Sequence, residues 1–161
     1  MSLGDHFKQT TWLGYLALPR IAVGFFFVQF GLQKLNPNFL SGEQLARQLT
    51  RASGDPLAFH RDFILNTVVP HAHLFGYLIS YGEIAIGLSL LFGCLVRISS
   101  TFGAFHNLNI FFAVAIPNGG AQVGLNRIFI VLQVMFLFAS AGRVFGLDGI
   151  LKKRFPRSWL L

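Results

Sequence analysis

Four apolar segments, each close to the length of a membrane-crossing helix, constrain the fold of this chain more than any other feature. They cover about residues 12–35, 73–96, 98–116 and 125–145. A helix that crosses the hydrocarbon core needs about 20 mainly apolar residues. Lipid offers no partners to backbone polar groups, so a spanning segment must satisfy them internally. The sequence therefore predicts an all-α integral membrane protein, a four-helix bundle that forms one domain over residues 1–161.

The composition supports a membrane location and argues against nucleic-acid binding. Hydrophobic residues make up 53% of the chain and charged residues only 12%, about half the share in soluble domains. A soluble chain of this size has too little interior to bury so much apolar surface. The formal net charge is +7, but the basic residues flank the apolar segments. That distribution is typical of membrane orientation and of contact with anionic lipid.

The first connection between spans carries a helical pattern of its own. In SGEQLARQLTR, residues 41–51, Leu45 and Leu49 fall on one helix face, and Arg47 and Arg51 fall on the other. This pattern predicts an amphipathic helix at the membrane surface. A solvated loop with some helix is the alternative. After a break at SGDP, the stretch LAFHRDFILNTVVP is the candidate for a second interfacial helix.

The other connections are short, and together they predict a topology. A tight turn around Arg97 joins the second and third spans, and PNGGAQ at 117–122 joins the third and fourth. Four spans place both termini on one side. That side carries seven basic residues and the other carries five: Lys8, Arg97, Arg143, Lys152, Lys153, Arg154 and Arg157, against Lys34, Arg47, Arg51, Arg61 and Arg127. The excess predicts cytoplasmic termini in a multi-pass protein of a bacterial-type inner membrane.

One carboxylate lies in the middle of the second span. In YLISYGEIAIGLSLLFG the only charged residue is Glu83, about nine residues or ~14 Å from either end of the span. An unpaired carboxylate at that depth costs several kcal/mol (about 3 or more). The comparable cation is Arg20 in the first span. We therefore expect an ion pair or a short hydrogen-bonded relay between Arg20 and Glu83, and take both as candidate catalytic residues.

Small residues share the helix faces that carry these charges. Gly24 and Gly31 follow Arg20 at helical spacing, and Ser80 and Gly87 flank Glu83 on the second span. Small side chains let two helix backbones approach closely in lipid. The spacing predicts that the first and second spans pack through these faces.

Further polar residues on the third and fourth spans are candidate cofactor-binding groups. His106 and Asn109 lie one turn apart within FHNLNIFF, and Asn126 and Gln133 lie seven residues apart on one face. With one polar stripe on every span, the stripes can converge on a polar pocket inside the bundle. The alternative is that these side chains only form interhelical hydrogen bonds, each contributing about 0.6 kcal/mol.

Other cofactor classes find little support in the sequence. A single cysteine, Cys94, excludes an internal disulfide and any paired-cysteine site. His106 is the only histidine deep in a span, whereas a transmembrane b-haem needs a facing pair. The HAH at 71–73 is a weak metal pattern because alternate helical residues diverge. We therefore predict no metal, flavin or haem site, and no nucleotide-binding motif is present.

Three segments in order resemble the DoxX/DoxD family. They are LPRIAVGFFFVQFGLQKL at 18–35, GEIAIGLSLLFGCLVR at 82–97 and AGRVFGLDGIL at 141–151. NPNF at 36–39 and FHNLNIFFAVA at 105–115 are closer to the DoxD branch. The family includes the membrane subunit of thiosulfate:quinone oxidoreductase. The resemblance implies a four-helix membrane protein in quinone-linked redox chemistry, and its intramembrane polar positions match Arg20, Glu83, His106 and Asn109.

Two functions from different classes follow. The first is a membrane subunit of a quinone-linked redox complex, with a polar intramembrane pocket for a quinone head and a proton relay. As an enzyme it would be a quinone-dependent oxidoreductase subunit that receives electrons from another membrane or peripheral subunit, because the chain has no redox centre of its own. The second is a non-catalytic accessory subunit packed against a larger respiratory or photosynthetic complex. Partners are then the lipid bilayer, other subunits and, for either function, further copies of the chain.

Overall fold

The computed structural model describes residues 3–50 and 54–158, with side chains from Gly14 onward. The predicted roles of Arg51 and of the Lys8 side chain therefore lie outside the described parts. Within them every regular element is helical, which confirms the all-α prediction. The elements are α1 (Leu3–Gln33), α2 (Pro37–Leu40), α3 (Glu43–Leu49), α4 (Ala58–Phe63), η2 (Ile64–Val68), α5 (Ala72–Phe92), α6 (Val96–Ile110), η3 (Phe111–Ala115), α7 (Ile116–Asn118), α8 (Ala121–Ala139), η4 (Ala141–Arg143) and α9 (Leu147–Arg154).

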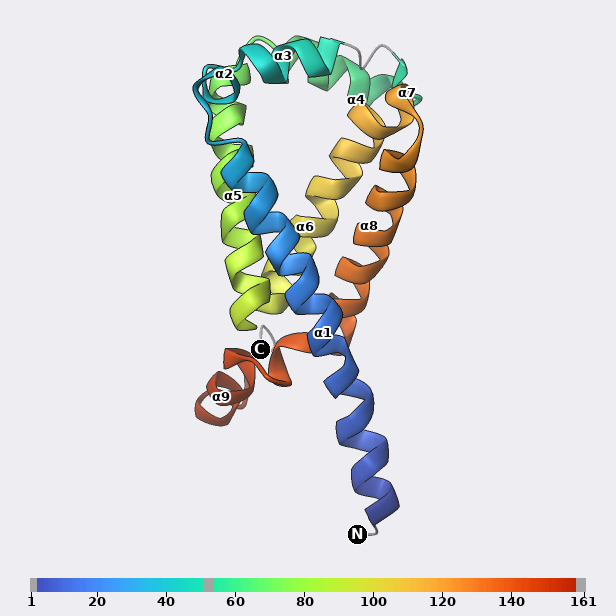
Figure 1. The fold of residues 1–161 in the computed structure, drawn as a ribbon, viewed down its shortest axis with the longest axis vertical. Helices are drawn as coiled ribbons and strands as arrows, with labels where there is room; N and C mark the ends of the chain where they lie inside the picture. Colours follow the sequence, from blue (N-terminus) through green and yellow to red (C-terminus); the bar gives the residue numbers. More distant parts are fainter. Residues whose placement is uncertain (1–2, 51–53, 159–161) are drawn as a thin grey trace.

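The long helices form two pairs, α1 with α5 and α6 with α8 (Figure 1). In that view the pairs lie close at the lower end and spread toward the upper end, where α2, α3 and α4 lie across the bundle. The start of α1 and the α9 helix lie at the lower end, so the two ends of the described chain share one side of the bundle. This agrees with the topology predicted from the sequence.

Among the described residues, three helices are long and apolar enough to cross a membrane: Gly14–Gln33 of α1, Ala72–Phe92 and Ala121–Ala139. The predicted span at 98–116 has a different form. Its α-helical part, α6, has 15 residues, and the chain continues through the π-helical η3 into the short α7. The helical path therefore reaches Asn118, but no single α-helix there has the spanning length. A fourth crossing stays a prediction.

The α1–α5 interface is a close helix contact built on glycines. A Cβ added to Gly87 would lie 2.6 Å from the backbone nitrogen of Val28 and 2.7 Å from the carbonyl oxygen of Gly24. A Cβ on Gly31 would lie 2.8 Å from the carbonyl oxygen of Ser80. These distances leave no room for side chains, so the two backbones touch along the predicted small-residue faces.

The upper end of the bundle is covered by the helices of the first connection. Leu45 and Leu49 of α3 are buried, while Arg47 on the opposite face is exposed. Their apolar partners are Phe39, Ile64, Val68, Ala72 and Ala113. The predicted amphipathic helix is therefore present over Glu43–Leu49, and its apolar face packs on the bundle itself.

The lower end differs from the sequence expectation in where its helices stop. The turn between α5 and α6 lies at residues 93–95 and not around Arg97, because Gly93 adopts a left-handed conformation (φ 63°) that ends α5. Likewise α8 ends at Ala139 and not near residue 145, since Ser140 is left-handed (φ 50°). The buried carboxylate of Asp148 accepts hydrogen bonds from the backbone N–H groups of Leu95 and Val96 and so caps α6.

Candidate functional site

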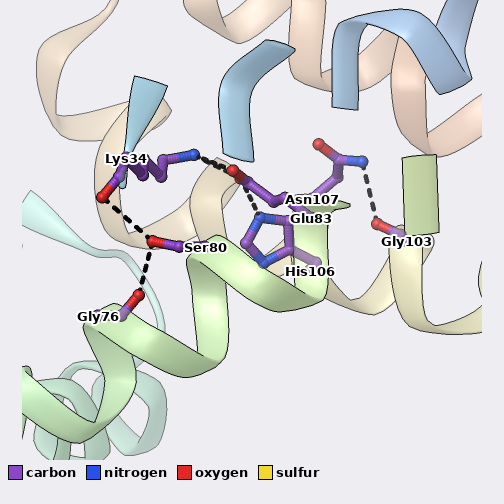
Figure 2. Close-up of polar contacts among 7 residues, drawn as sticks. All are labelled: Lys34, Gly76, Ser80, Glu83, Gly103, His106 and Asn107. Atoms are coloured by element: carbon purple, nitrogen blue, oxygen red, sulfur yellow. Dashed lines mark hydrogen bonds and ion pairs between the residues drawn. The ribbon is translucent and has the colours of Figure 1, made fainter. Parts of the chain in front are cut away.

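Glu83 lies at the centre of a polar cluster formed by three segments (Figure 2). Lys34 Nζ lies 2.5 Å from each carboxylate oxygen of Glu83. His106 Nε2 lies 2.7 Å from Glu83 Oε1. Only 3% of the Glu83 side chain is exposed, against 26% for Lys34 and 17% for His106. The acid is thus enclosed, while both of its partners retain some access to the surroundings.

The local fold explains why Lys34 reaches the acid. Lys34 directly follows the last residue of α1, at the end of the face that carries Gly24 and Gly31. Ser80 Oγ donates to the Lys34 carbonyl oxygen at 3.3 Å and to the Gly76 carbonyl oxygen at 2.8 Å. Because the glycine contacts bring α1 against α5, the lysine side chain extends along α5 to Glu83 (Figure 2).

Aromatic rings surround the cluster. The Lys34 ammonium lies 6.0 Å from the ring centroids of Phe30 and Phe39, a favourable position for a cation. The His106 ring lies 6.3 Å from that of Phe27, which packs at 6.0 Å against Phe129. These rings place apolar surface next to the ion pair, and a less polar environment strengthens its attraction.

The predicted ion pair between Arg20 and Glu83 is wrong. The guanidinium of Arg20 is fully buried and donates from Nη1 to the Ala141 carbonyl oxygen at 3.0 Å and from Nη2 to the Phe145 carbonyl oxygen at 2.9 Å. Asp148 supplies the nearby negative charge. Arg20 lies 14 residues before Lys34, with Gly24 and Gly31 between them, and so nearer the lower end of the bundle. At that level its guanidinium reaches the segment after α8 and not the middle of α5.

Asn109 belongs to a different polar cluster at the upper end. Its Nδ2 donates to the Phe105 carbonyl oxygen, and its Oδ1 lies 3.1 Å from His60 Nε2. His60 Nδ1 lies 2.5 Å from a carboxylate oxygen of buried Asp55. This chain of contacts fastens the segment before α4 to α6. Sequence reasoning did not find His60 or Asp55, whose contacts depend on how the first connection folds back.

Asn126 and Gln133 lie in the α6–α8 interface. Asn126 Nδ2 donates to the Gln122 carbonyl oxygen of its own helix. Both amide atoms of Gln133 are buried without a hydrogen-bond partner among the described residues. Its side chain packs on the backbone of Gly103, three residues before His106. These contacts lie within α8 and against α6 and do not include Glu83, so the predicted role of Asn126 and Gln133 in binding stays a prediction.

Lys34 is the site residue that the sequence analysis missed. It was counted among the basic residues of the first connection. Its spacing in the sequence could have identified it. Lys34 follows Gly31 by three residues and Arg20 by fourteen, which places all three residues on one helix face.

The cluster joins one carboxylate to two nitrogen-bearing side chains. A carboxylate accepts hydrogen bonds only, so Lys34 and His106 Nε2 are its donors. Within the described residues no group of three or more His, Cys, Asp or Glu side chains gathers as metal ligands would.

Comparison with known proteins identifies the family. A model of the family described as "TQO small subunit DoxD", where TQO is thiosulfate:quinone oxidoreductase, matches residues 15–160. Searches of curated proteins and of solved structures gave no match. The matched range includes every residue of the Glu83 cluster and nearly the whole chain. This membrane protein therefore belongs to the DoxD family.

Proposed function

We propose that this chain is the membrane subunit of a quinone-linked redox complex, and that the Lys34–Glu83–His106 cluster binds the quinone head and supplies its protons. The observation that carries the proposal is the asymmetry of exposure in this cluster. The acid is enclosed, whereas the ammonium and the imidazole next to it remain partly accessible. A ligand at this face meets two hydrogen-bond donors backed by a buried carboxylate.

The surrounding residues suit a quinone ring. Quinone sites combine an apolar slot with a few donors directed at the two carbonyl oxygens. Phe30 is partly exposed beside the donors, and the buried rings of Phe27 and Phe129 pack next to it. We retain Gln133 as a proposed donor to the second carbonyl, because its buried amide has no partner among the described residues. Asn109 and Asn126 lie in other contacts and are retained only as further candidates for binding the quinone.

The reaction needs two electrons and two protons for each quinone reduced to quinol. The described residues contain no redox centre, so an electron-donating partner subunit supplies the electrons. Lys34 or His106 donates a proton to a reduced carbonyl oxygen, and the Glu83 carboxylate stabilises the donor while it is charged. Glu83 then takes up a proton from the aqueous side and passes it to the deprotonated donor, and a second such round supplies the second proton. In this proposal the chain provides a site, shielded from lipid, at which both proton transfers to the quinone take place.

Extraction of bound quinone tests the proposal. The chain is purified with a mild detergent, and the quinone that accompanies it is measured per protein for wild type, Glu83→Gln and His106→Ala. His71→Ala is the matched control, because the His71 side chain is exposed and its Nδ1 lies 2.9 Å from the carbonyl oxygen of Thr67, away from the Glu83 cluster. We expect both cluster variants to lose most of the quinone and the control to keep it. Equal retention in all four proteins would refute the proposal.

An accessory role is the second candidate, and the closed hydrogen-bonding of Glu83 favours it. Both oxygens of the acid already have partners within the chain, and a cluster that does no more than hold α1, α5 and α6 together would show the same contacts. Purification of the complex from cells separates the two functions. An intact complex that turns over normally with Glu83→Gln supports the accessory role, and an intact complex that no longer reduces quinone supports the first.

We also propose a bacterial-type inner membrane with the ends of the chain in the cytoplasm. The basic residues of α9, Lys152, Lys153 and Arg154, lie at the same end of the bundle as the start of α1 (Figure 1). Positive charge of this kind favours the cytoplasmic side. Reporter fusions after residue 158 and within the first connection test this orientation.

A further inference from the structure

We propose that the quinone enters from the lipid between α1 and α8, through a gate formed by the rings of Phe26, Phe30 and Phe129. The inference rests on the proposed function and adds to it a route and a substrate class, a quinone with a long isoprenoid tail. The ring centroids of Phe26 lie 6.2 Å from those of Phe30 and Phe129, which are 6.3 Å apart. Because Phe129 belongs to α8 and the other two to α1, this aromatic triangle spans the contact between the two helices.

The outer side of the aromatic triangle lies at the depth of the acyl chains. Phe26 is 43% exposed and Phe30 is half-buried, whereas Phe129 is buried. Phe26 belongs to the candidate span Gly14–Gln33 and lies seven residues before its end, about 10 Å along the helix axis. A side chain exposed at that depth borders the hydrocarbon core, which is where the tail of a membrane quinone is dissolved.

The inner side of the aromatic triangle reaches both proposed proton donors. The Phe30 ring centroid lies 6.0 Å from the Lys34 ammonium. Phe129 packs at 6.0 Å against Phe27, whose ring lies 6.3 Å from that of His106. Ring contacts thus lead from the lipid-facing side of the triangle to each donor.

Two neighbouring helix contacts are closed by packing on glycine. At α1–α5 a Cβ on Gly87 would meet backbone atoms of Val28 and Gly24, and at α6–α8 a Cβ on Gly103 would collide with the Gln133 amide. Helices packed this closely separate only if they move as a whole, whereas rings can rotate about their side-chain bonds. Since α1 and α8 diverge toward the upper end (Figure 1), their contact depends on long side chains. Ring rotation can therefore open the α1–α8 contact and not the other two.

A gate in this place favours a quinone with a long tail. The head lies behind the rings beside the two donors, so the tail has to pass between Phe26 and Phe129 to remain in the lipid. The methyl and double-bond groups of an isoprenoid chain then make dispersion contacts with the rings, in place of those that the closed rings make with one another.

Labelling by the tail tests the route in the full wild-type chain. A quinone with a photoreactive diazirine on its first isoprenoid unit is bound in detergent, cross-linked and mapped by mass spectrometry, with the unmodified quinone as competitor. We expect competed labels on α1 at Phe26 and Phe30 and on α8 near Phe129. Competed labels confined to α2, α3 and α4 at the upper end would place the entry there and overturn the inference.

The rate of quinone exchange tests the gate. Radiolabelled quinone bound to the purified chain is exchanged against an excess of unlabelled quinone, and the retained label is measured over time. We expect Phe26→Ala to speed the exchange about tenfold and Phe26→Trp, with a larger ring, to slow it, a range that is usual among variants of one binding site. Phe138→Ala is the matched control, because Phe138 is 78% exposed on α8 and lies outside the triangle. Equal exchange rates in all four proteins would overturn the inference.

The gate and the proposed function fail in different ways. If the wild-type chain retains no quinone, the proposed function is refuted and the gate with it. If quinone is retained and is lost in Glu83→Gln, but neither the exchange rate nor the tail labels involve the triangle, only the gate is refuted. A Phe26 variant that unfolds at a lower temperature than wild type is set aside, and the tail labels of the wild-type chain then decide.

Discussion

The ammonium of Lys34 lies 2.5 Å from both carboxylate oxygens of Glu83, and this contact joins the end of α1 to the middle of α5. The pair balances its charges inside the bundle, because Glu83 is almost fully buried. His106 adds a contact from α6 to the same carboxylate. One acid therefore connects three helices and explains why a charge is tolerated at that depth.

Loss of one partner of this pair will destabilise the fold more than loss of both. Lys34→Met leaves a buried carboxylate without its cation, a change that typically costs about 3–5 kcal/mol. Lys34→Met combined with Glu83→Gln removes both charges and is expected to recover most of that loss. Unfolding in mixed detergent micelles, followed by circular dichroism, measures the coupling between the two sites.

The exposed ion pair of Glu43 and Arg47 on α3 is the control for this comparison of single and double variants. Its coupling is expected to be about 0.3–0.5 kcal/mol, as for other exposed helical pairs. A coupling at the buried pair as small as that of the exposed one would show that the Lys34–Glu83 contact does not hold the helices together.

Adding one methyl group at Gly87 will disrupt the α1–α5 interface. The new Cβ meets backbone atoms of Val28 and Gly24, which cannot move aside as a side chain can. We expect Gly87→Ala to lower the free energy of unfolding by about 1–3 kcal/mol. Gly82→Ala, on the same helix with nothing near its Cβ, should be neutral or slightly stabilising. Thermal unfolding in detergent compares the two, and equal stability would contradict the close packing.

Arg20 acts on the lower end of the bundle and not on Glu83. Arg20→Met removes the two donors that hold the carbonyl oxygens of Ala141 and Phe145 and leaves Asp148 without its neighbouring cation. We expect faster chymotrypsin cleavage at Phe145, whereas Arg154→Gln, an exposed change on α9, should leave the rate unchanged. If Arg20→Met alters quinone retention with no change in cleavage, Arg20 has the direct role in the site that the sequence suggested.

The thiol of Cys94 will react slowly at neutral pH. Burial raises the pKa of this thiol, and the negative charge of Asp148 raises it further. The thiolate is the reactive form, so fewer molecules are reactive at pH 7–8 than for an exposed cysteine. Because the pKa is raised, the rate of alkylation by iodoacetamide should keep increasing with pH beyond about 8.5, the ordinary pKa of cysteine. A rate that levels off below that pH would contradict the burial.

The sequence predicted the long helices and the buried acid because both depend on local patterns. Unbroken apolar stretches predict α1, α5 and α8 by length alone, and a lone carboxylate in one of them must be paired. The small-residue faces likewise predicted the α1–α5 contact. His106 was found because it is the only histidine deep in a span.

The partner of Glu83 could not be chosen from span positions alone. Arg20 and Lys34 lie on the same face of α1, and the choice between them depends on the vertical register of α1 against α5. That register is set by the Gly24, Gly31 and Gly87 contacts. The helix ends at Gly93 and Ser140 depend on left-handed residues, and a left-handed serine carries no clear sequence signal.

Photo-crosslinking with an azido-quinone tests the central claim most directly. The labelled peptides of the purified chain are mapped by mass spectrometry in wild type and in His106→Ala, with an excess of unmodified quinone as competitor. The account predicts competed labelling on α1, α5 and α6 next to Lys34, Glu83 and His106, and its loss in the variant. Labelling confined to lipid-exposed residues such as Phe102 and Phe138, unchanged by competitor or variant, would contradict it.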